Sequence, residues 1–199
     1  MCNLYRMTKS DGEVAKWFDA VNAASRSNSA DHIWPGYPGL VVADGELRSM
    51  SWGFPLVMKS KRTGEPLKPK PVNNARTDKL DSFFWKSSFE KRRCLLPLTA
   101  GAEAEGPKGD KTRTWLSLPD VDIFAVAGVW RDSDEFGPCY SMVMTSAAGA
   151  ASEVHDRMPV ILRPDAYASW QNGDPIEAKE LCRPFEGDIV LDRTSEGWT

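Results

Sequence analysis

The sequence predicts an α+β fold in which a strongly bent, mainly antiparallel sheet is flanked by helices. Strand-like runs dominate the middle of the chain, and helical patterns occur near its ends and between hairpins. No repeated strand–helix–strand unit is present that would build a parallel sheet. With 199 residues the chain is long enough to bury a substantial core without disulfides or a structural metal. Because no internal repeat divides it, we expect one domain over residues 1–199.

The first expected elements are a helix and a hairpin. Ser10-Asp11-Gly12-Glu13 has the spacing of a capping box, which predicts a helix over residues 12–24. Residues 25–39 are rich in Ser, Asn, Pro and Gly and are predicted to form a loop. Residues 40–54 then contain two strand-like runs around Asp44-Gly45, a strong signal for a tight hairpin turn.

The remaining elements follow from composition and apolar pattern. Five basic residues and three prolines predict an exposed irregular loop over residues 59–73. Beyond it we expect a helix near 81–89, strands within 113–118, 123–130 and 140–146, and short helices over 165–171 and 175–182.

Composition excludes several classes of protein. An apolar fraction of 41% and eight tryptophans indicate a packed globular protein, and no apolar run approaches the roughly 20 residues of a membrane span. Acidic residues are scattered through the first thirty positions, which fits neither a signal peptide nor a transit peptide. We therefore expect a cytoplasmic protein, associated with the nucleoid if it is bacterial.

The four cysteines and the charge distribution limit the kinds of binding site that we expect. Cysteines at positions 2, 94, 139 and 182 have no CxxC pairing, and with two histidines they form no zinc pattern, so we expect free thiols and no metal. Residues 59–113 carry a net charge of +7, whereas the rest of the chain carries −10. The middle of the chain is therefore either a polyanion-binding region or a solvated charged face.

Cys2 has chemistry available only to a terminal residue. Removal of Met1 would leave a free α-amine with a pKa near 8, so that a useful fraction is neutral at physiological pH. Such an amine attacks an aldehyde to form a Schiff base, and the adjacent thiol can close onto the imine carbon to give a thiazolidine. The alternative is an ordinary buried or frayed thiol.

The roles of the other candidate site residues depend on their surroundings. His155 follows a small-residue loop and could exchange protons at the rim of a cleft, or be structural. Glu103 and Glu105 lie among small residues where burial would raise a carboxyl pKa, and spacing alone does not choose between them. Asn74 and Arg76 could orient a nucleophile and bind a phosphate, or could form a surface turn.

These residues occur within ordered motifs. The motifs are Met1-Cys2, Ser51-Trp52-Gly53-Phe54, Asn74-Ala75-Arg76, Arg93-Cys94-Leu95-Leu96-Pro97 and the segment HDRMPVIL from His155 to Leu162. Together, over positions 1 to 162, they resemble the SOS-response-associated peptidase (SRAP) family of abasic-site DNA–protein crosslinking proteins. The chain departs from the family pattern at Leu4, where a basic residue is usual, and in Thr99–Ala104, where aromatic residues are missing.

The resemblance implies a barrel-like sheet, a positively charged groove for single-stranded DNA, and a covalent bond between Cys2 and the aldehyde of an abasic site. It places Asn74, Glu103 and His155 in the catalytic set with Cys2 and favours Glu103 over Glu105. It also implies that DNA is bound by Arg76, Lys59, Lys61, Arg62 and Trp52. The implied partner is single-stranded DNA containing abasic sites, bound by a monomer without cofactor or metal.

Further activities are possible for this set of residues. The Schiff base could decay by β-elimination, giving weak lyase activity. A thiol peptidase using Cys2 and His155 is an alternative, with removal of its own Met1 as its reaction. A non-enzymatic single-strand-binding module, in which Cys2 is incidental, is the third possibility.

Overall fold

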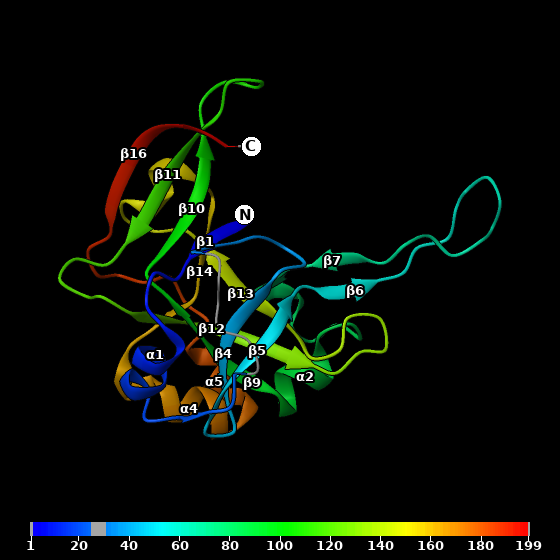
Figure 1. Cartoon of the computed structure of the whole chain (residues 1–199), viewed down its shortest axis with the longest axis horizontal. Helices are drawn as coiled ribbons and strands as arrows, with labels where there is room; N and C mark the ends of the chain where they lie inside the picture. The colour runs from blue at the N-terminus through cyan, green and yellow to red at the C-terminus, as the bar shows by residue number, and fades with distance from the viewer. Residues whose placement is uncertain (1, 25–30, 199) are drawn as a thin grey trace.

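The computed structural model describes residues 2–24 and 31–198. It confirms the predicted α+β class, with short helices packed around bent sheets of mainly antiparallel strands (Figure 1). Strand pairing defines a nine-stranded sheet, a five-stranded sheet and a two-stranded arm.

The nine-stranded sheet is partly ring-like. β13 (Cys139–Ser146) pairs antiparallel with β12 (Phe124–Arg131) and also parallel with β5 (Glu46–Trp52). The series of paired strands from β13 through β12 to β5 therefore closes on itself. Its other strands are β4 (Pro38–Ala43), β9 (Arg93–Leu98), β14 (Arg157–Pro159), β15 (Ile161–Leu162), β8 (Asn74–Arg76) and β2 (Val21–Asn22). All six residues of β9 are buried, so this strand runs through the core.

The five-stranded sheet holds the N-terminal segment. β1 (Leu4–Arg6) lies between β10 (Ala100–Glu105) and β3 (His32–Ile33), and Leu4 is opposite Ala102. β11 (Thr112–Ser117) and β16 (Val190–Gly197) complete this sheet.

Neither β10 nor β16 was predicted from sequence. β10 reads AGAEAE, and Ala, Gly and Glu are poor strand formers. β16 is mostly exposed and lacks an apolar alternation. Pairing with neighbouring strands, rather than the residues' own preference, therefore makes these two segments extended.

The basic segment is an arm rather than an irregular loop. β6 (Phe54–Leu56) pairs antiparallel with β7 (Lys70–Val72), and an isolated bridge joins Lys59 to Pro66. The prediction of no regular structure over 59–73 is therefore wrong at the base of the segment, because the flanking strands hold its two ends side by side. The arm projects away from the rest of the molecule (Figure 1).

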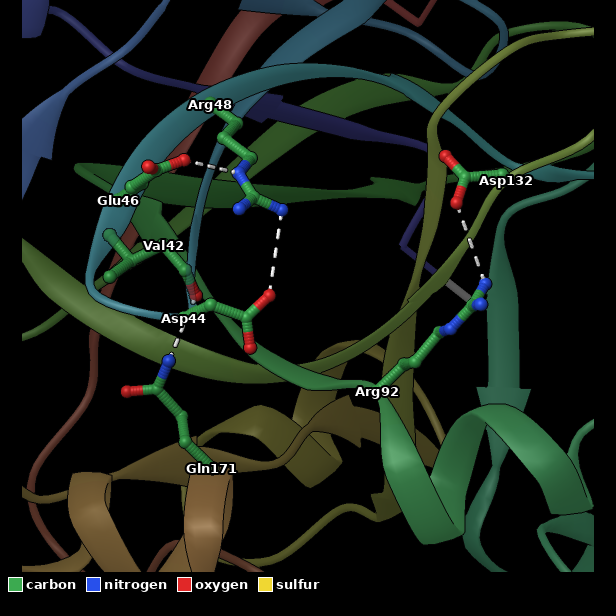
Figure 2. Close-up of polar contacts among 7 residues, drawn as sticks. All are labelled: Val42, Asp44, Glu46, Arg48, Arg92, Asp132 and Gln171. Carbon is green, nitrogen blue, oxygen red and sulfur yellow. Dashed lines mark hydrogen bonds and ion pairs between the residues drawn. The ribbon is translucent and has the colours of Figure 1, made fainter.

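The predicted hairpin is confirmed as β4 and β5. Asp44 and Gly45 form its turn with φ angles of 53° and 77°, as the tight turns that match strand twist require. Arg48 donates to Glu46 at 2.9 Å and lies 3.5 Å from Asp44. Figure 2 draws both contacts. From the helix beneath, Gln171 Nε2 donates to the Val42 carbonyl at 3.1 Å.

The first helix is shorter than expected. Ser10 and Glu13 form the predicted capping box, but α1 covers only Asp11–Trp17. Asp19 adopts a left-handed φ of 49°, which ends the helix, and the chain then enters β2. Of the loop predicted over 25–39, residues 25–30 lie outside the described residues.

The other helices are all short. The helix expected near 81–89 begins only at Lys86, because hydrogen-bonded turns occupy the preceding residues. These elements are η1 (Thr77–Lys79), α2 (Lys86–Lys91), α3 (Ala151–Val154), η2 (Pro164–Ala166), α4 (Tyr167–Asn172) and α5 (Pro175–Glu180). Within the described ranges, no helix has the length and apolar character needed to cross a bilayer.

Candidate functional site

Cys2 lies just ahead of β1 and is separated from it by Asn3. Its side chain is 2% exposed, and its Sγ donates to the Leu4 carbonyl at 3.3 Å. Burial, reinforced by the negative charge of Glu103, raises the thiol pKa to about 12. The thiol is therefore protonated at neutral pH and is a poor nucleophile on its own.

Glu103 is a buried carboxyl group whose pKa suits a general acid or base. It lies in β10, is 6% exposed, and has its pKa raised to about 7 by desolvation. Near neutral pH both of its protonation states are populated, so it can accept and donate a proton.

Glu105 has a different role from Glu103. Its carboxylate accepts a hydrogen bond from Thr114 and forms an ion pair with Arg193 of β16 at 3.0 Å. Glu103, in contrast, lines a pocket together with Cys2. The geometry thus places Glu103, and not Glu105, beside the thiol.

The pocket between the two sheets is largely apolar. Cys2, Glu103 and Arg157 are its ionisable residues. The rest of its lining is Leu98, Gly101, Ala102, Leu116, Ser117, Leu118, Phe124, Ala151, Met158, Pro159, Ile161 and Ile189. A low-polarity lining accounts for the raised pKa values of both Cys2 and Glu103.

Two neighbouring amides hold the backbone of Cys2. Asn74 Nδ2 donates to the Cys2 carbonyl at 2.8 Å, and Asn73 Nδ2 donates to the same oxygen at 3.0 Å. Both amides also contact the Asn3 side-chain oxygen, at 3.4 and 3.1 Å. Asn74 Oδ1 is buried and has no hydrogen-bond partner among the described residues.

Asn73 and Asn3 were missed by sequence reasoning. The doubled asparagine before Ala75 was the available signal for Asn73, which lies between β7 and β8 and directs its amide at the same carbonyl as Asn74. Asn3 lies in no motif that would have singled it out.

His155 follows α3 and precedes β14. Its Nδ1 accepts a hydrogen bond from the Arg157 backbone N–H at 2.9 Å, so the neutral ring carries its proton on Nε2. The Asp156 carboxylate lies 2.7 Å from Nδ1 and favours the charged ring, but partial burial prevails and lowers the His155 pKa. Charges on Asp156 and Lys111 act on the pKa values of both His155 and Glu103, which locates the two groups in one electrostatic environment.

The predicted DNA-contacting cations fall into two groups. Arg76 is held by Asp78 through two hydrogen bonds of 2.9 and 2.7 Å, and Asp78 also lies 3.6 Å from Arg157. One carboxylate therefore sits between two guanidinium groups beside the pocket. The other predicted cations, Lys59, Lys61 and Arg62, are exposed on the arm.

The prediction that Trp52 contacts DNA is wrong. Its side chain is fully buried, with its ring 5.0 Å from that of Tyr5 in an edge-on arrangement. Its indole N–H donates to the Asn73 carbonyl at 3.0 Å. Trp52 thus supports the segment that presents Asn73 and Asn74 to Cys2.

Two curated proteins resemble this chain over most of its length. The chain is 28% identical over 165 residues to the abasic site processing protein YoqW of Bacillus subtilis, covering 74% of this chain and 70% of that protein. The abasic site processing protein YobE of the same organism is 27% identical, with coverage of 74% and 71%.

A solved structure from Bacteroides thetaiotaomicron superposes with a TM-score of 0.80 at 19% identity, covering 96% of this chain and 91% of that one, and therefore shares its fold. Residues 1–196 match the sequence profile described as SOS response associated peptidase. The chain belongs to the SOS response associated peptidase (SRAP) family.

Proposed function

We propose that this protein captures abasic sites in single-stranded DNA by forming a covalent thiazolidine between Cys2 and the ring-opened sugar. The observation that carries the proposal is the shared pocket of Cys2 and Glu103, a carboxyl group with a pKa of about 7. The names of the relatives, abasic site processing proteins, support the choice of the abasic site as substrate.

The reaction begins at the α-amine of Cys2, which becomes available when Met1 is removed. The neutral amine attacks the C1′ aldehyde to give a carbinolamine, and loss of water gives an imine. The thiol sulfur then adds to the imine carbon, and the thiol proton passes to the imine nitrogen. Amine, aldehyde and thiol thereby become a thiazolidine and water. Ring closure is favoured because the thiol is already held next to the imine.

The order of the two bond-forming steps follows from the pKa values. A thiol with a pKa of about 12 stays protonated, so the amine reacts first. Glu103 is suited to protonate the carbinolamine hydroxyl, so that it leaves as water, and to take protons from nitrogen, with neutral His155 as the second proton carrier. Asn74 fixes the Cys2 carbonyl and offers its buried Oδ1 as an acceptor for the Cys2 N–H.

The DNA backbone is assigned to the basic residues beside the pocket and on the arm. Arg76 supplies a planar guanidinium suited to a phosphate. Lys59, Lys61 and Arg62 extend the positive surface along the exposed arm, where salt-sensitive contacts to single-stranded DNA are expected.

Two side reactions belong to the same proposal. The imine can lose the 3′ phosphate by β-elimination, which gives weak lyase activity, and the protein could remove its own Met1. General peptidase activity is disfavoured by the raised thiol pKa, because the thiolate is the attacking species in thiol peptidases.

The experiment incubates the protein with single-stranded DNA that contains one abasic site and follows a heat-stable adduct on a denaturing gel. Cys2→Ala is expected to give at least about 100-fold less adduct, because the thiazolidine cannot form. Cys2→Ser keeps an amine but no thiol, so its adduct should appear only after borohydride trapping. Cys182→Ala, which removes another free thiol, is the matched control and should react normally.

Three results would count against the proposal. Wild-type yield from Cys2→Ala would exclude Cys2 as the attachment point. Intact mass showing retained Met1 in reactive protein would exclude chemistry at the Cys2 amine. Equal affinity for intact and abasic strands without any covalent product would indicate a non-covalent binding module.

A further inference from the structure

Four hydrogen bonds converge on two oxygen atoms beside Cys2. Asn74 Nδ2 donates to the Cys2 carbonyl at 2.8 Å and to Asn3 Oδ1 at 3.4 Å. Asn73 Nδ2 donates to the same two oxygens at 3.0 and 3.1 Å. An amide nitrogen carries two N–H groups, and a carbonyl oxygen accepts two hydrogen bonds. The donors and the lone pairs of this network are therefore matched.

The network determines which end of each amide faces Cys2. The Cys2 carbonyl can only accept, so the nitrogen ends of Asn73 and Asn74 must point toward it. The Asn3 side chain must then present its oxygen, because both of its partners are donors. A flipped Asn74 amide would place its oxygen against two acceptors. Asn3 thus adds a second acceptor that holds the Asn74 amide in one orientation.

This orientation leaves the oxygen of Asn74 for the reacting group. Asn74 Oδ1 is buried, and no donor in the described part of the chain reaches it. In the proposed reaction this oxygen accepts from the Cys2 α-amine, which belongs to the same residue as the carbonyl that Asn74 Nδ2 holds. One amide thereby holds both ends of Cys2, provided that it does not flip.

Asn73 is anchored on the side away from Cys2. Its carbonyl accepts from the Trp52 indole N–H at 3.0 Å and from the Met142 backbone N–H at 2.9 Å. Trp52 is fully buried, and Met142 belongs to β13 of the nine-stranded sheet. The Asn73 amide is therefore carried by the core of the protein, whereas Asn3 is an exposed residue ahead of β1.

We propose that Asn3 and Asn73 are positioning residues for the Cys2 α-amine, and that they act by fixing the orientation of the Asn74 amide. Because Asn3 is exposed, ordering its side chain costs rotamer freedom without burying apolar surface. Its two hydrogen bonds therefore serve the arrangement of Cys2 rather than the core. This inference rests on the proposed function for the reaction at the amine.

The test measures the single-turnover rate of adduct formation with abasic single-stranded DNA. Asn3→Ala and Asn73→Ala should each lower the rate at saturating DNA by about 5- to 20-fold, because each removes two hydrogen bonds from the network. The DNA concentration that gives half of the maximal rate should not change, since the lost contacts are made to Cys2 and to the other asparagines.

A conservative variant and a remote variant control for effects on folding. Asn3→Asp keeps an oxygen that accepts from both amides, so it should react at close to the wild-type rate at saturating DNA. Asn22→Ala is the matched control, because Asn22 is an exposed residue of β2 whose amide donates to Asp11 at 3.2 Å. It should react as the wild type does. Equal slowing by Asn3→Ala and Asn3→Asp would overturn the inference.

A double-variant cycle tests whether Asn3 acts through Asn74. In an Asn74→Ala background there is no amide left to orient, so adding Asn3→Ala should lower the rate by no more than about 2-fold. A general effect on folding would instead give the same loss in both backgrounds. The full loss in the Asn74→Ala background would therefore overturn the inference.

Reaction with acetaldehyde separates this inference from the proposed function. Without DNA, the amine and thiol of Cys2 condense with acetaldehyde to a thiazolidine and water, which intact mass detects. If Cys2→Ala forms as much DNA adduct as wild type while Asn3→Ala still slows the acetaldehyde reaction, the proposed function fails and the positioning role stands. If Cys2 is required for the DNA adduct but Asn3→Ala reacts normally with both aldehydes, the chemistry stands and the positioning role fails.

Discussion

At the scale of single residues, the charge of Glu103 affects the protonation of Cys2. Both are buried, and the charge of Glu103 contributes to the raised thiol pKa. The protein thus retains an ionisable carboxyl group in a place where its charged form is costly. That cost should be visible in the stability of the fold.

The Glu103 pKa predicts how stability depends on pH. The pKa is about 7 in the folded protein against an ordinary value of 4.5, so the unfolded chain ionises first as the pH rises. Stability is therefore lost as the pH rises from 4.5 through 7. Glu103→Gln removes this loss, so its stability relative to wild type should increase by about 2–3 kcal/mol between pH 4.5 and pH 8.

Urea denaturation at the two pH values provides the measurement. Glu105→Gln is the control, because it removes a carboxylate that is ion paired with Arg193 and should be destabilising without a similar gain at pH 8. A stability difference between Glu103→Gln and wild type that does not change with pH would contradict the pKa shift.

The residues of the site were predictable only in part. Glu103 and Glu105 are two positions apart in a strand and so share a face, and spacing could not distinguish them. The distinction arises from Arg193, some ninety residues later, which takes Glu105 as its partner. The tryptophan–glycine motif suggested that Trp52 contacts DNA, whereas the Trp52 side chain is buried in the hydrophobic core.

At the scale of elements, Gly53 explains the tryptophan–glycine motif. It separates β5 from β6 with a φ of 122°, a conformation that favours glycine. A Cβ atom at this position would overlap the Pro71 side chain and lie 2.9 Å from Pro71 Cα. The glycine therefore lets β7 of the arm pass close to the chain just after Trp52.

Gly53→Ala should consequently destabilise the protein by about 3 kcal/mol or more, since it adds a steric clash to an unfavourable φ. Gly45→Ala is the matched control. It has a positive φ of 77° but no atom within 4 Å of the added Cβ, so about 1 kcal/mol is expected. Equilibrium denaturation of both variants gives the comparison, and equal losses would show that the close approach to Pro71 is unimportant.

Local signals predicted some elements and failed for others. Asp44-Gly45 specified its turn, and Ser10 and Glu13 specified the start of α1, because each acts through neighbouring residues. The end of α1 depends on Asp19, whose left-handed φ leads into β2 and its pairing with β5. Pairing between distant strands is invisible to a local pattern.

At the scale of the whole molecule, β16 links the two parts of the site. Arg193 pairs with Glu105 of β10 at 3.0 Å and with Glu153 of α3 at 3.1 Å. Glu105 is two residues after Glu103, and Glu153 is two residues before His155. One guanidinium thus joins the segments that carry the two proton-transfer groups.

Arg193→Ala should slow adduct formation about 3- to 10-fold at saturating DNA, as expected for the loss of two partly exposed ion pairs that position other groups. Affinity for intact single-stranded DNA should be unchanged, because Arg193 is not among the basic residues to which the DNA backbone is assigned. Arg193→Lys should recover part of the rate. Single-turnover gels measure the rate, and an unaltered rate would show that β16 is not needed to position these groups.

The location of the arm has a consequence for proteolysis. Its exposed stretch contains Lys59, Lys61 and Arg62, which are cleavage points for a protease that cuts after basic residues. On either side of it, β5 and β8 both pair with β13. A cut in the arm would therefore leave two fragments joined through one shared strand, with Cys2 in the first fragment and Glu103 in the second.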